Sequence, residues 1–340
     1  MPMSVHGNPL PTSIKMLRIG LVLSPGFGVM SLCTMSVFDI ANIELGQKFY
    51  DVHLISEYGG PMRSSMGAVV ETEQYDDSTF DTLITCGTGN MPCSPAFCTY
   101  LRATAARTRR IGATCRGAFA LAEAGVLNGV RVTTHWSYAA DFRRRFPQIN
   151  LDENRLYIAD GSIWTSAGMT ASIDQSLAMV EKDLGFDLAK AVAKTLNLAY
   201  RRSGAQPQAS ALLDIGPRND RMQCAIAYAR ANLHKSLSVE ELARVAHLSP
   251  RQFARVFRTD TGMSPAKAIE KMRIEAARLL VQDGRHSIEH IARQTGFGKT
   301  ERMRRAFIRV CGTPPQGVRR DARVDREEYD CDRLLTSLID

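Results

Sequence analysis

The stretch from Ser287 to Pro315, "SIEHIARQTGFGKTERMRRAFIRVCGTPP", decides the fold of the carboxyl-terminal part of the chain, because it repeats an earlier stretch. The earlier copy, from Ser238 to Pro265, reads "SVEELARVAHLSPRQFARVFRTDTGMSP". Four residues recur 49 positions later, and after one inserted residue four more recur 50 positions later: Ser238, Glu240, Ala243 and Arg244, then Arg255, Phe257, Gly262 and Pro265. Such a repeat indicates that one small structural unit is present twice.

Each copy has the pattern of a helix-turn-helix. Ser238 and Ser287 are expected to cap a first helix, with Glu241 completing a capping box in the first copy. The second helix follows Ser249-Pro250 in the first copy, where proline suits the first helical position. In the second copy it follows the turn Gly296–Gly298. We expect these second helices to bury apolar residues and to expose the polar ones between them; the residues expected to be buried are Phe253, Val256, Phe257, Met303, Phe307 and Val310.

A longer helix is predicted between the copies, from Ser264-Pro265 to about Val281. It would span about 27 Å at 1.5 Å per residue. Helices held that far apart can enter successive major grooves, which lie about 34 Å apart on one face of DNA. Arginine can then bind guanine in a bidentate manner, and other basic side chains can neutralise phosphates.

Positive charge is concentrated in the same region. Residues 219–323 hold 21 Lys and Arg against 10 Asp and Glu, a net charge of +11. Residues 1–218 carry a net charge of +1, and residues 324–340 carry −4. Basic helical faces are often merely solvated, but a duplicated helix-turn-helix with this excess charge favours DNA binding.

This region resembles the AraC/XylS family DNA-binding domain over about residues 219–322. The second copy carries the family pattern as Ile291-Ala292, Gly296-Phe297, Arg305-Ala306-Phe307 and Gly312–Pro315. The resemblance points to seven base-reading residues: Arg251, Ala254, Arg255, Thr300, Glu301, Arg304 and Arg305. The predicted DNA-binding set also includes Gln252, Arg258 and Lys299. Ala254 departs from the polar residue often found there, so it contacts a thymine methyl group or nothing.

The amino-terminal half alternates short apolar runs with helical patterns. Strands are expected at Met16–Ser24, Tyr50–Ser56, Thr82–Cys86, Arg110–Thr114, Val130–Thr134 and Ile163–Ser166. Helices are expected at Met30–Leu45, Pro95–Thr108, Gly117–Ala124 and from about Ala171. This alternation predicts an α/β domain with a doubly wound parallel sheet of flavodoxin-like type. Ligands bind such sheets beyond the carboxyl ends of the strands. Gly87-Thr88, Cys115-Arg116 and His135-Trp136 are placed there.

Cys115 lies between a strand and a helix, as in a nucleophile elbow. The helix amino terminus is expected to lower the pKa of its thiol. The arrangement resembles the PfpI/class I glutamine-amidotransferase-like superfamily over roughly residues 16–190. Thr133–Trp136, "TTHW", and Gly168–Asp174, "GMTASID", resemble regulators of that superfamily. The whole chain is therefore similar to GlxA-type AraC regulators.

Catalysis would need a base beside the thiol, and the pattern does not supply the usual one. Arg116 stands where the superfamily's hydrolases commonly have histidine, and Ser24–Met35 contains no Asp or Glu. His135 stays open as a base. We therefore predict a sensor that is not an enzyme, with Gly87, Thr88, Cys115, Arg116, His135 and Trp136 as ligand-binding residues.

The chemistry of these residues suggests the ligand. Arg116 can pair with a carboxylate, and Trp136 can face a cation or an apolar group. An amino-acid-like or betaine-like metabolite fits both. Three alternatives stay open: Trp136 lies in the core, Arg116 pairs within a dimer interface, or His135 only caps a strand.

The predicted organisation has five parts: a flexible tail at 1–15, a PfpI-like sensor and dimerisation domain at 16–200, a linker at 201–218, an all-α double helix-turn-helix domain at 219–322, and an acidic tail at 323–340. The resemblance implies a homodimeric activator that binds promoter DNA, a small effector and RNA polymerase. Without a signal peptide or an apolar run of membrane length, we expect a cytoplasmic protein.

Cofactors and metals are not expected, because the eight cysteines lack zinc spacing. Two other functions are kept as alternatives. One is a thiol-dependent amidase or deglycase fused to a DNA-binding domain. The other is a regulator that senses oxidants through Cys115.

Overall fold

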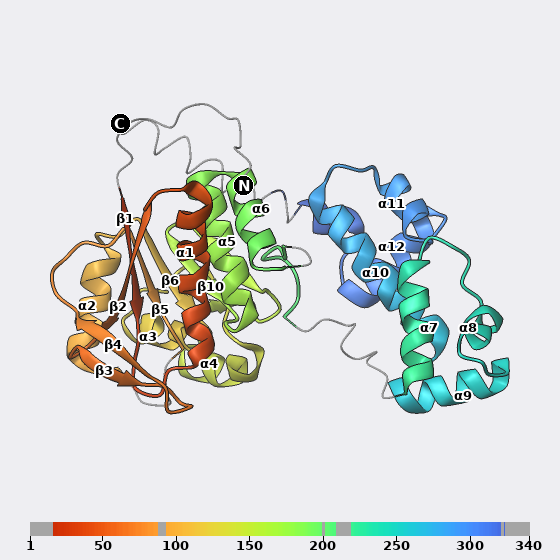
Figure 1. Ribbon diagram of the computed structural model, residues 1–340, viewed down its shortest axis with the longest axis horizontal. Coiled ribbons are helices and arrows are strands. Elements are labelled where there is room, and N and C mark those ends of the chain that lie inside the picture. Colours follow the sequence, from red (N-terminus) through yellow and green to blue (C-terminus); the bar gives the residue numbers. More distant parts are fainter. Residues whose placement is uncertain (1–15, 88–92, 199–200, 209–218, 321–322, 324–340) are drawn as a thin grey trace. The chain divides into compact units, whose positions relative to one another are not determined.

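The computed structural model describes residues 16–87, 93–198, 201–208, 219–320 and 323. The chain forms two compact units, Met1–Gln208 and Ala209–Asp340, which are described separately (Figure 1). The predicted amino-terminal tail and nearly all of the acidic tail lie outside the described residues.

The first unit contains an eight-stranded sheet in the order β3-β4-β2-β1-β5-β6-β10-β9. Five neighbouring strands form its parallel centre: β2 (Tyr50–Ser56), β1 (Leu17–Val22), β5 (Thr82–Thr85), β6 (Arg110–Thr114) and β10 (Ile163–Ser166). Reversal of the strand order beside β1 gives the predicted doubly wound, flavodoxin-like topology.

The edges of the sheet were not predicted. β4 (Val69–Gln74) pairs in parallel with β2, whereas β3 (Gly60–Arg63) and β9 (Tyr157–Asp160) are antiparallel to their neighbours. The strand expected at Val130–Thr134 is shorter, because β7 (Arg131–Val132) pairs only with β8 (Asn150–Leu151) in a separate small sheet.

Helices cover both faces of the sheet. α1 (Cys33–Leu45), α5 (Thr170–Leu184) and α6 (Phe186–Thr195) contact one another on one side, and Figure 1 shows them as one layer. α2 (Pro95–Ala105), α3 (Gly117–Glu123) and α4 (Ala139–Arg145) contribute to the core on the opposite side. Two short 3₁₀ helices, η1 (Val29–Leu32) and η2 (Trp136–Tyr138), precede α1 and α4.

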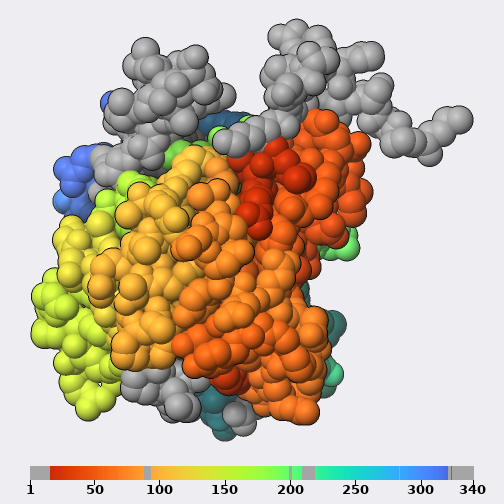
Figure 2. Space-filling model, turned by 90° about the vertical axis from the view of Figure 1, so that its left-hand side faces the viewer, coloured from red at the N-terminus to blue at the C-terminus, as the bar shows by residue number. Residues whose placement is uncertain are grey.

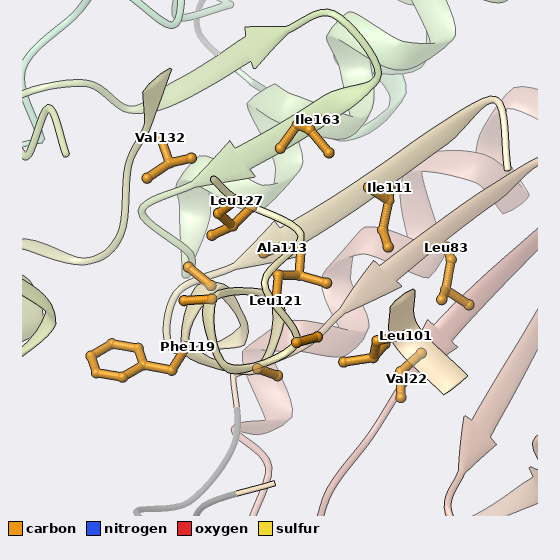
Figure 3. Packing of buried hydrophobic residues seen from close by; sticks show 14 of the residues in the cluster. Val22, Leu83, Leu101, Ile111, Ala113, Phe119, Leu121, Leu127, Val132 and Ile163 are labelled. Atoms are coloured by element: carbon orange, nitrogen blue, oxygen red, sulfur yellow. The ribbon is translucent and has the colours of Figure 1, made fainter. Parts of the chain in front are cut away.

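A large core cluster of the first unit fixes α3 against the sheet. Ile111 and Ala113 of β6 point into it together with Leu121 of α3 and Leu101 of α2 (Figure 3). Because only two residues separate β6 from α3, these residues, Cys115 and Arg116, are held at the carboxyl end of β6.

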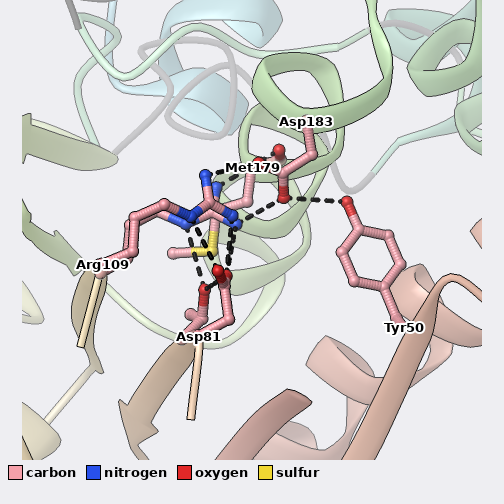
Figure 4. A network of polar contacts seen from close by, with 7 residues as sticks. Tyr50, Asp81, Arg109, Met179 and Asp183 are labelled. Carbon is pink, nitrogen blue, oxygen red and sulfur yellow. Dashed lines mark hydrogen bonds and ion pairs between the residues drawn. The ribbon is translucent and has the colours of Figure 1, made fainter. Parts of the chain in front are cut away.

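A polar network fixes the opposite, amino ends of the strands (Figure 4). Arg109 donates to both carboxylate oxygens of Asp81, at 2.7 and 2.9 Å. Asp183 of α5 accepts from Arg109, Arg110 and the Tyr50 hydroxyl. Burial alone raises the pKa of Asp183, but the charges and hydrogen bonds of Arg110 and Arg109 outweigh burial and lower it. The network ties α5 to the sheet.

The β3–β4 hairpin lies at the surface. Figure 2 shows the side of the molecule that carries this hairpin, in orange, and α2. Tyr58 and Met66, which flank β3 in sequence, are largely exposed.

Among the described residues, no helix has the length and apolar character of a membrane-spanning segment.

The second unit is helical, as predicted. Its helices include α7 (Asp220–Ala231), α8 (Val239–Val245), α9 (Pro250–Thr261), α10 (Pro265–Asp283), α11 (Ile288–Gln294) and α12 (Thr300–Cys311). α7, α8 and α9 share one core cluster, and α11 and α12 share another. α10 contributes Ile269 and Met272 to the first cluster and Ile274 and Ala277 to the second. It is the predicted long helix between two helix-turn-helix units.

Two local predictions in this unit were wrong. Ser238 caps α8 as expected, but the Glu241 carboxylate accepts from the Tyr228 hydroxyl rather than completing a capping box. The capping box forms instead at the start of α9, between Ser249 and Gln252. Val310, expected to pack inward, is 39% exposed, and Ala306 one turn earlier is buried in its place.

Candidate functional site

The predicted sharp turn at Cys115 is present. Its φ is +54°, in the left-handed region that residues other than glycine rarely adopt, and its N–H donates to the Ser166 carbonyl at 2.9 Å. Two glycines make the turn possible. A Cβ at Gly117 would lie 2.1 Å from the Thr85 oxygen, and one at Gly168 would lie 2.3 Å from the Cys115 Cβ. The glycine of the GMTASID motif is therefore required by the turn.

The thiol at this turn is not activated. Burial raises the pKa of Cys115, and the Arg116 N–H and guanidinium only partly offset that effect. The expected lowering of the pKa by the helix terminus was therefore wrong, because burial dominates. Within the described parts of the chain, no hydrogen bond joins His135 to this thiol.

Arg116 lies against aromatic rings. Its Cζ is 4.7 Å from the ring centroid of Tyr138 and 5.0 Å from that of Phe119. Its Nε is buried and has no hydrogen-bond partner among the described residues. The side chain therefore keeps an unused donor beside the turn.

The TTHW segment passes directly over the turn. The Thr134 hydroxyl donates to the Cys115 carbonyl at 2.7 Å. His135 caps η2 through Ser137, and burial lowers its pKa. Trp136 is 62% exposed, so the alternative that it belongs to the core is wrong.

These residues form one cluster, which we call the strand-end site and define as Gly87, Cys115, Arg116, His135, Trp136 and Tyr138. The Tyr138 ring joins Arg116 to His135, whose ring centroid lies 5.5 Å from that of Trp136. A Cβ at Gly87 would lie 3.4 Å from that of Cys115. Thr88 lies outside the described residues. Sequence reasoning missed Tyr138, although it follows Trp136 by only two positions.

Residues 201–208, expected to begin the linker, are instead bound to the first unit, and we call them the strap. Arg202 donates through Nε and Nη2 to the Asp174 carboxylate, which is buried in α5. At the other end, the Gln208 side chain makes four hydrogen bonds to residues 133–136 and to Arg155. Composition alone hid this, because Ser, Gly and Gln are also typical of flexible linkers.

Cys93, Cys98 and Glu123 bring potential metal-ligand atoms within 4.8 Å of one another. Cys93 precedes the Ser94 cap of α2 and Cys98 is the fourth residue of that helix, positions whose side chains commonly pack together. Burial and the Glu123 charge raise the pKa of both thiols, and Arg145 pairs with the Glu123 carboxylate. Packing and hydrogen bonding explain this cluster.

On α9, the predicted DNA-binding arginines Arg251, Arg255 and Arg258 are exposed. Within the described ranges they form no ion pair, so their charges are available to a polyanion. The Gln252 side chain accepts from Ser249 in the capping box, and Ala254 is half-buried. These two residues are thus less free than predicted to contact DNA.

α12 differs because an acid accompanies its arginines. Arg304 Nε donates to Glu301 at 2.9 Å, and Arg305 lies 3.7 Å from the same carboxylate. The hydrogen bond with Arg304 lowers the pKa of Glu301. Lys299 is exposed at the helix start, and Thr300 is half-buried.

One buried arginine connects the two helix-turn-helix units. Arg273 of α10 donates to the carbonyls of Leu233 and Lys235, at 3.1 and 2.6 Å. Gly296 lies in the turn of the second helix-turn-helix. It packs so closely that a Cβ there would lie 1.9 Å from the Leu233 oxygen. Their spacing is therefore fixed by direct contact as well as by α10.

Comparison with known proteins matches both units. A model described as a helix-turn-helix domain matches residues 242–321, and a model of the DJ-1/PfpI family matches residues 34–182. The chain is 30% identical to the HTH-type transcriptional regulator GlxA of Rhizobium meliloti, covering 89% of this chain and 95% of that protein. It is 29% identical to the regulator GbdR of Pseudomonas aeruginosa, covering 88% and 83%.

The sensor half is also similar to an enzyme. An isonitrile hydratase of Pseudomonas putida is 30% identical over 190 residues, which is 54% of this chain and 79% of that protein. GlxA and GbdR, which match along most of the chain, are transcriptional regulators.

Proposed function

The chain belongs to the GlxA-type AraC-family transcriptional regulators, and we propose that its effector is a small zwitterionic metabolite bound at the strand-end site. One observation carries the proposal. Arg116 has a buried Nε without a hydrogen-bond partner among the described residues, while Trp136, linked to it through Tyr138 and His135, is 62% exposed. A guanidinium recognises a carboxylate, and an exposed indole recognises a cation. Amino acids and betaines carry both groups.

Binding without turnover fits the same geometry. Burial raises the pKa of the Cys115 thiol, and Arg116 cannot accept a proton. The similarity to an isonitrile hydratase makes a hydratase the second candidate function. The two are separated by comparing the wild type with Cys115→Ala: a thiol enzyme consumes an isonitrile and loses all consumption on this substitution, whereas a sensor consumes none in either protein.

Thermal unfolding of the full chain with a panel of amino acids and betaines tests the effector. A true effector should raise the melting temperature of the wild type. Arg116→Lys should weaken binding by about tenfold, because the ammonium cannot form the bidentate contact. Trp136→Ala should lower the affinity most for metabolites that carry a cationic group. Arg143→Ala serves as a control at an exposed position. Equal binding by all variants would place the ligand elsewhere.

DNA recognition is proposed for the exposed faces of α9 and α12. Arg305→Ala should weaken binding to a selected genomic DNA site by about 1–3 kcal/mol, and Arg251→Ala should have a similar effect. Arg230→Ala, on the exposed side of α7, is the matched control because it removes the same charge. The affinity for random DNA should fall less; an equal loss on both DNAs would contradict base reading by Arg305.

The remaining assignments follow from the family. We propose a cytoplasmic homodimer that assembles through the sensor and activates transcription by contact with RNA polymerase. Sedimentation of the full chain tests the dimer, and transcription from the bound promoter in a purified system tests activation.

A further inference from the structure

We propose that Gln208 positions the TTHW segment and transmits its state to the connector that leads to the DNA-binding unit. The inference rests on the proposed function, because it takes the strand-end site as the place where the effector binds. Gln208 is the last residue of the first compact unit. Ten residues, 209–218, separate it from Asn219, which caps α7.

The Gln208 amide uses both of its ends. Its Oε1 accepts from the Trp136 N–H at 2.8 Å. Its Nε2 lies 2.7 Å from the Thr134 carbonyl and 3.1 Å from the Arg155 carbonyl, and it also reaches the Thr133 hydroxyl at 3.2 Å. One side chain thus binds the backbone on both sides of His135, within a segment whose next turn carries Tyr138.

The rest of the strap is fixed independently of this segment. Arg202 is held by Asp174, and the Leu156 N–H donates to the carbonyls of Gly204 and Gln206, both at 3.0 Å. A Cβ at Gly204 would lie 2.3 Å from the Tyr157 oxygen, so the backbone packs directly on β9. Gln208 is therefore the point at which the strap meets the strand-end site, while residues 202–206 anchor it to the sheet.

This arrangement makes the Gln208 contacts sensitive to an effector. A ligand that covers Trp136 and Arg116 must favour one position of residues 133–138. Hydrogen bonds weaken steeply with small changes in distance and angle, so a shift of this segment strengthens or breaks the bonds to Gln208. Breaking them frees the chain after Gln206 and lengthens the connector. A ligand can act in this way only through different affinities for the two arrangements.

The amide group is specifically required. Glutamate has nearly the same shape, but its carboxylate cannot donate to the Thr134 and Arg155 carbonyls. Gln208→Glu should therefore detach the side chain while preserving its size. Gln148→Glu is the matched control, because Gln148 is exposed after α4 and the substitution adds the same charge.

The test uses full-length protein and a genomic DNA fragment selected by the wild type. With a stabilising amino acid or betaine, the wild type and Gln148→Glu should change DNA affinity at least fivefold. Gln208→Glu should bind the metabolite with an affinity within about threefold of the wild type but change DNA affinity less than twofold. An unchanged response in Gln208→Glu would overturn the inference. Loss of metabolite binding together with the response would also overturn it, since Gln208 would then only support the site.

Hydrogen exchange distinguishes this inference from the proposed function. Without any metabolite, the Trp136 amide of Gln208→Glu should exchange at least tenfold faster than in the wild type, while amides of the sheet stay unchanged. The ligand-free DNA affinity of this variant should also differ at least threefold from that of Gln148→Glu. If no metabolite binds the wild type, the proposed effector is wrong, and these two ligand-free readouts alone decide the role of Gln208. Wild-type values in both would refute it.

Discussion

Close backbone packing explains why particular residues stand at the turn of the sensor. Gly168 has a φ of +79° and touches Cys115, and Asp174 of the same motif holds Arg202 of the strap. One short motif thus shapes the turn and anchors the carboxyl end of the sensor unit. Packing against Cys115 accounts for Gly168, and pairing with Arg202 accounts for Asp174, so neither residue has to contact a ligand.

Gly168→Ala should destabilise the first unit by about 2–4 kcal/mol. About 1 kcal/mol comes from the left-handed backbone, and the rest comes from the clash with Cys115. Gly161→Ala is the control, since Gly161 also has a positive φ of +57° but has nothing within 4 Å of an added Cβ. Urea unfolding measures both. Equal losses would mean that the contact with Cys115 does not limit the turn.

The sequence predicted five of the six residues of the strand-end site. Gly87, Cys115 and Arg116 follow strands of the parallel sheet, whereas His135 and Trp136 follow β7 of the small separate sheet, and Tyr138 was missed. Residue types did not predict the thiol's pKa, which depends on how much of Cys115 is buried and hence on Gly168, 53 positions away. The role of Gln208 was equally hidden, since its four partners lie at distant positions in sequence.

At the scale of elements, the duplicated units are similar but not equivalent. The turn after α8 contains His247 at a φ of +55°. The second helix-turn-helix has Gly296, at a φ of +77°, in the corresponding position. Glycine is required in the second turn because that turn packs against Leu233, whereas His247 is exposed. Among the described residues, the arginines of α9 form no ion pair, whereas Arg304 and Arg305 of α12 pair with Glu301. We therefore expect the first helix-turn-helix to contribute more than the second to the salt-dependent affinity for DNA.

Gly296→Ala should destabilise the second unit by about 3 kcal/mol or more, because a Cβ would overlap the Leu233 carbonyl and displace Arg273. Gly298→Ala is a close control: its φ is +73°, and nothing lies within 4 Å of an added Cβ. Thermal unfolding of both variants provides the comparison. If Gly298→Ala is as damaging as Gly296→Ala, contact between the two helix-turn-helix units does not set their spacing.

Periodicity predicted the central strands and helices well, since buried parallel strands form continuous apolar runs. β3, β4 and β9 were missed because most of their residues are partly or fully exposed, so they form no continuous apolar run. Val310 was assigned to the core by spacing alone, but the last turn of α12 faces solvent and the smaller Ala306 packs instead.

At the scale of the whole molecule, the sheet separates two tasks. Its carboxyl ends hold the strand-end site, and its amino ends hold the network around Asp183. That network stabilises the sensor in a pH-dependent way. The pKa of Asp183 is lower in the folded than in the unfolded protein, where it is about 3.9. Its contribution is complete well above pH 4 and is lost as the pH falls through the folded pKa.

Asp183→Asn should lower the unfolding free energy at pH 7 by about 3–5 kcal/mol, because it leaves Arg109 and Arg110 with a buried neutral partner. Below about pH 4 the wild type should lose unfolding free energy as Asp183 becomes protonated, and the variant should not show this loss. Urea unfolding between pH 7 and pH 3 measures both effects. A parallel decline of the two proteins with pH would assign the acid sensitivity to other carboxylates.

The most direct test of regulation by the sensor is the affinity of the full-length wild type for a selected genomic fragment, with and without a saturating metabolite that stabilises it. A coupled sensor and DNA-binding unit should change this affinity at least fivefold, or about 1 kcal/mol. The same affinity in both conditions would contradict control of DNA binding by the strand-end site.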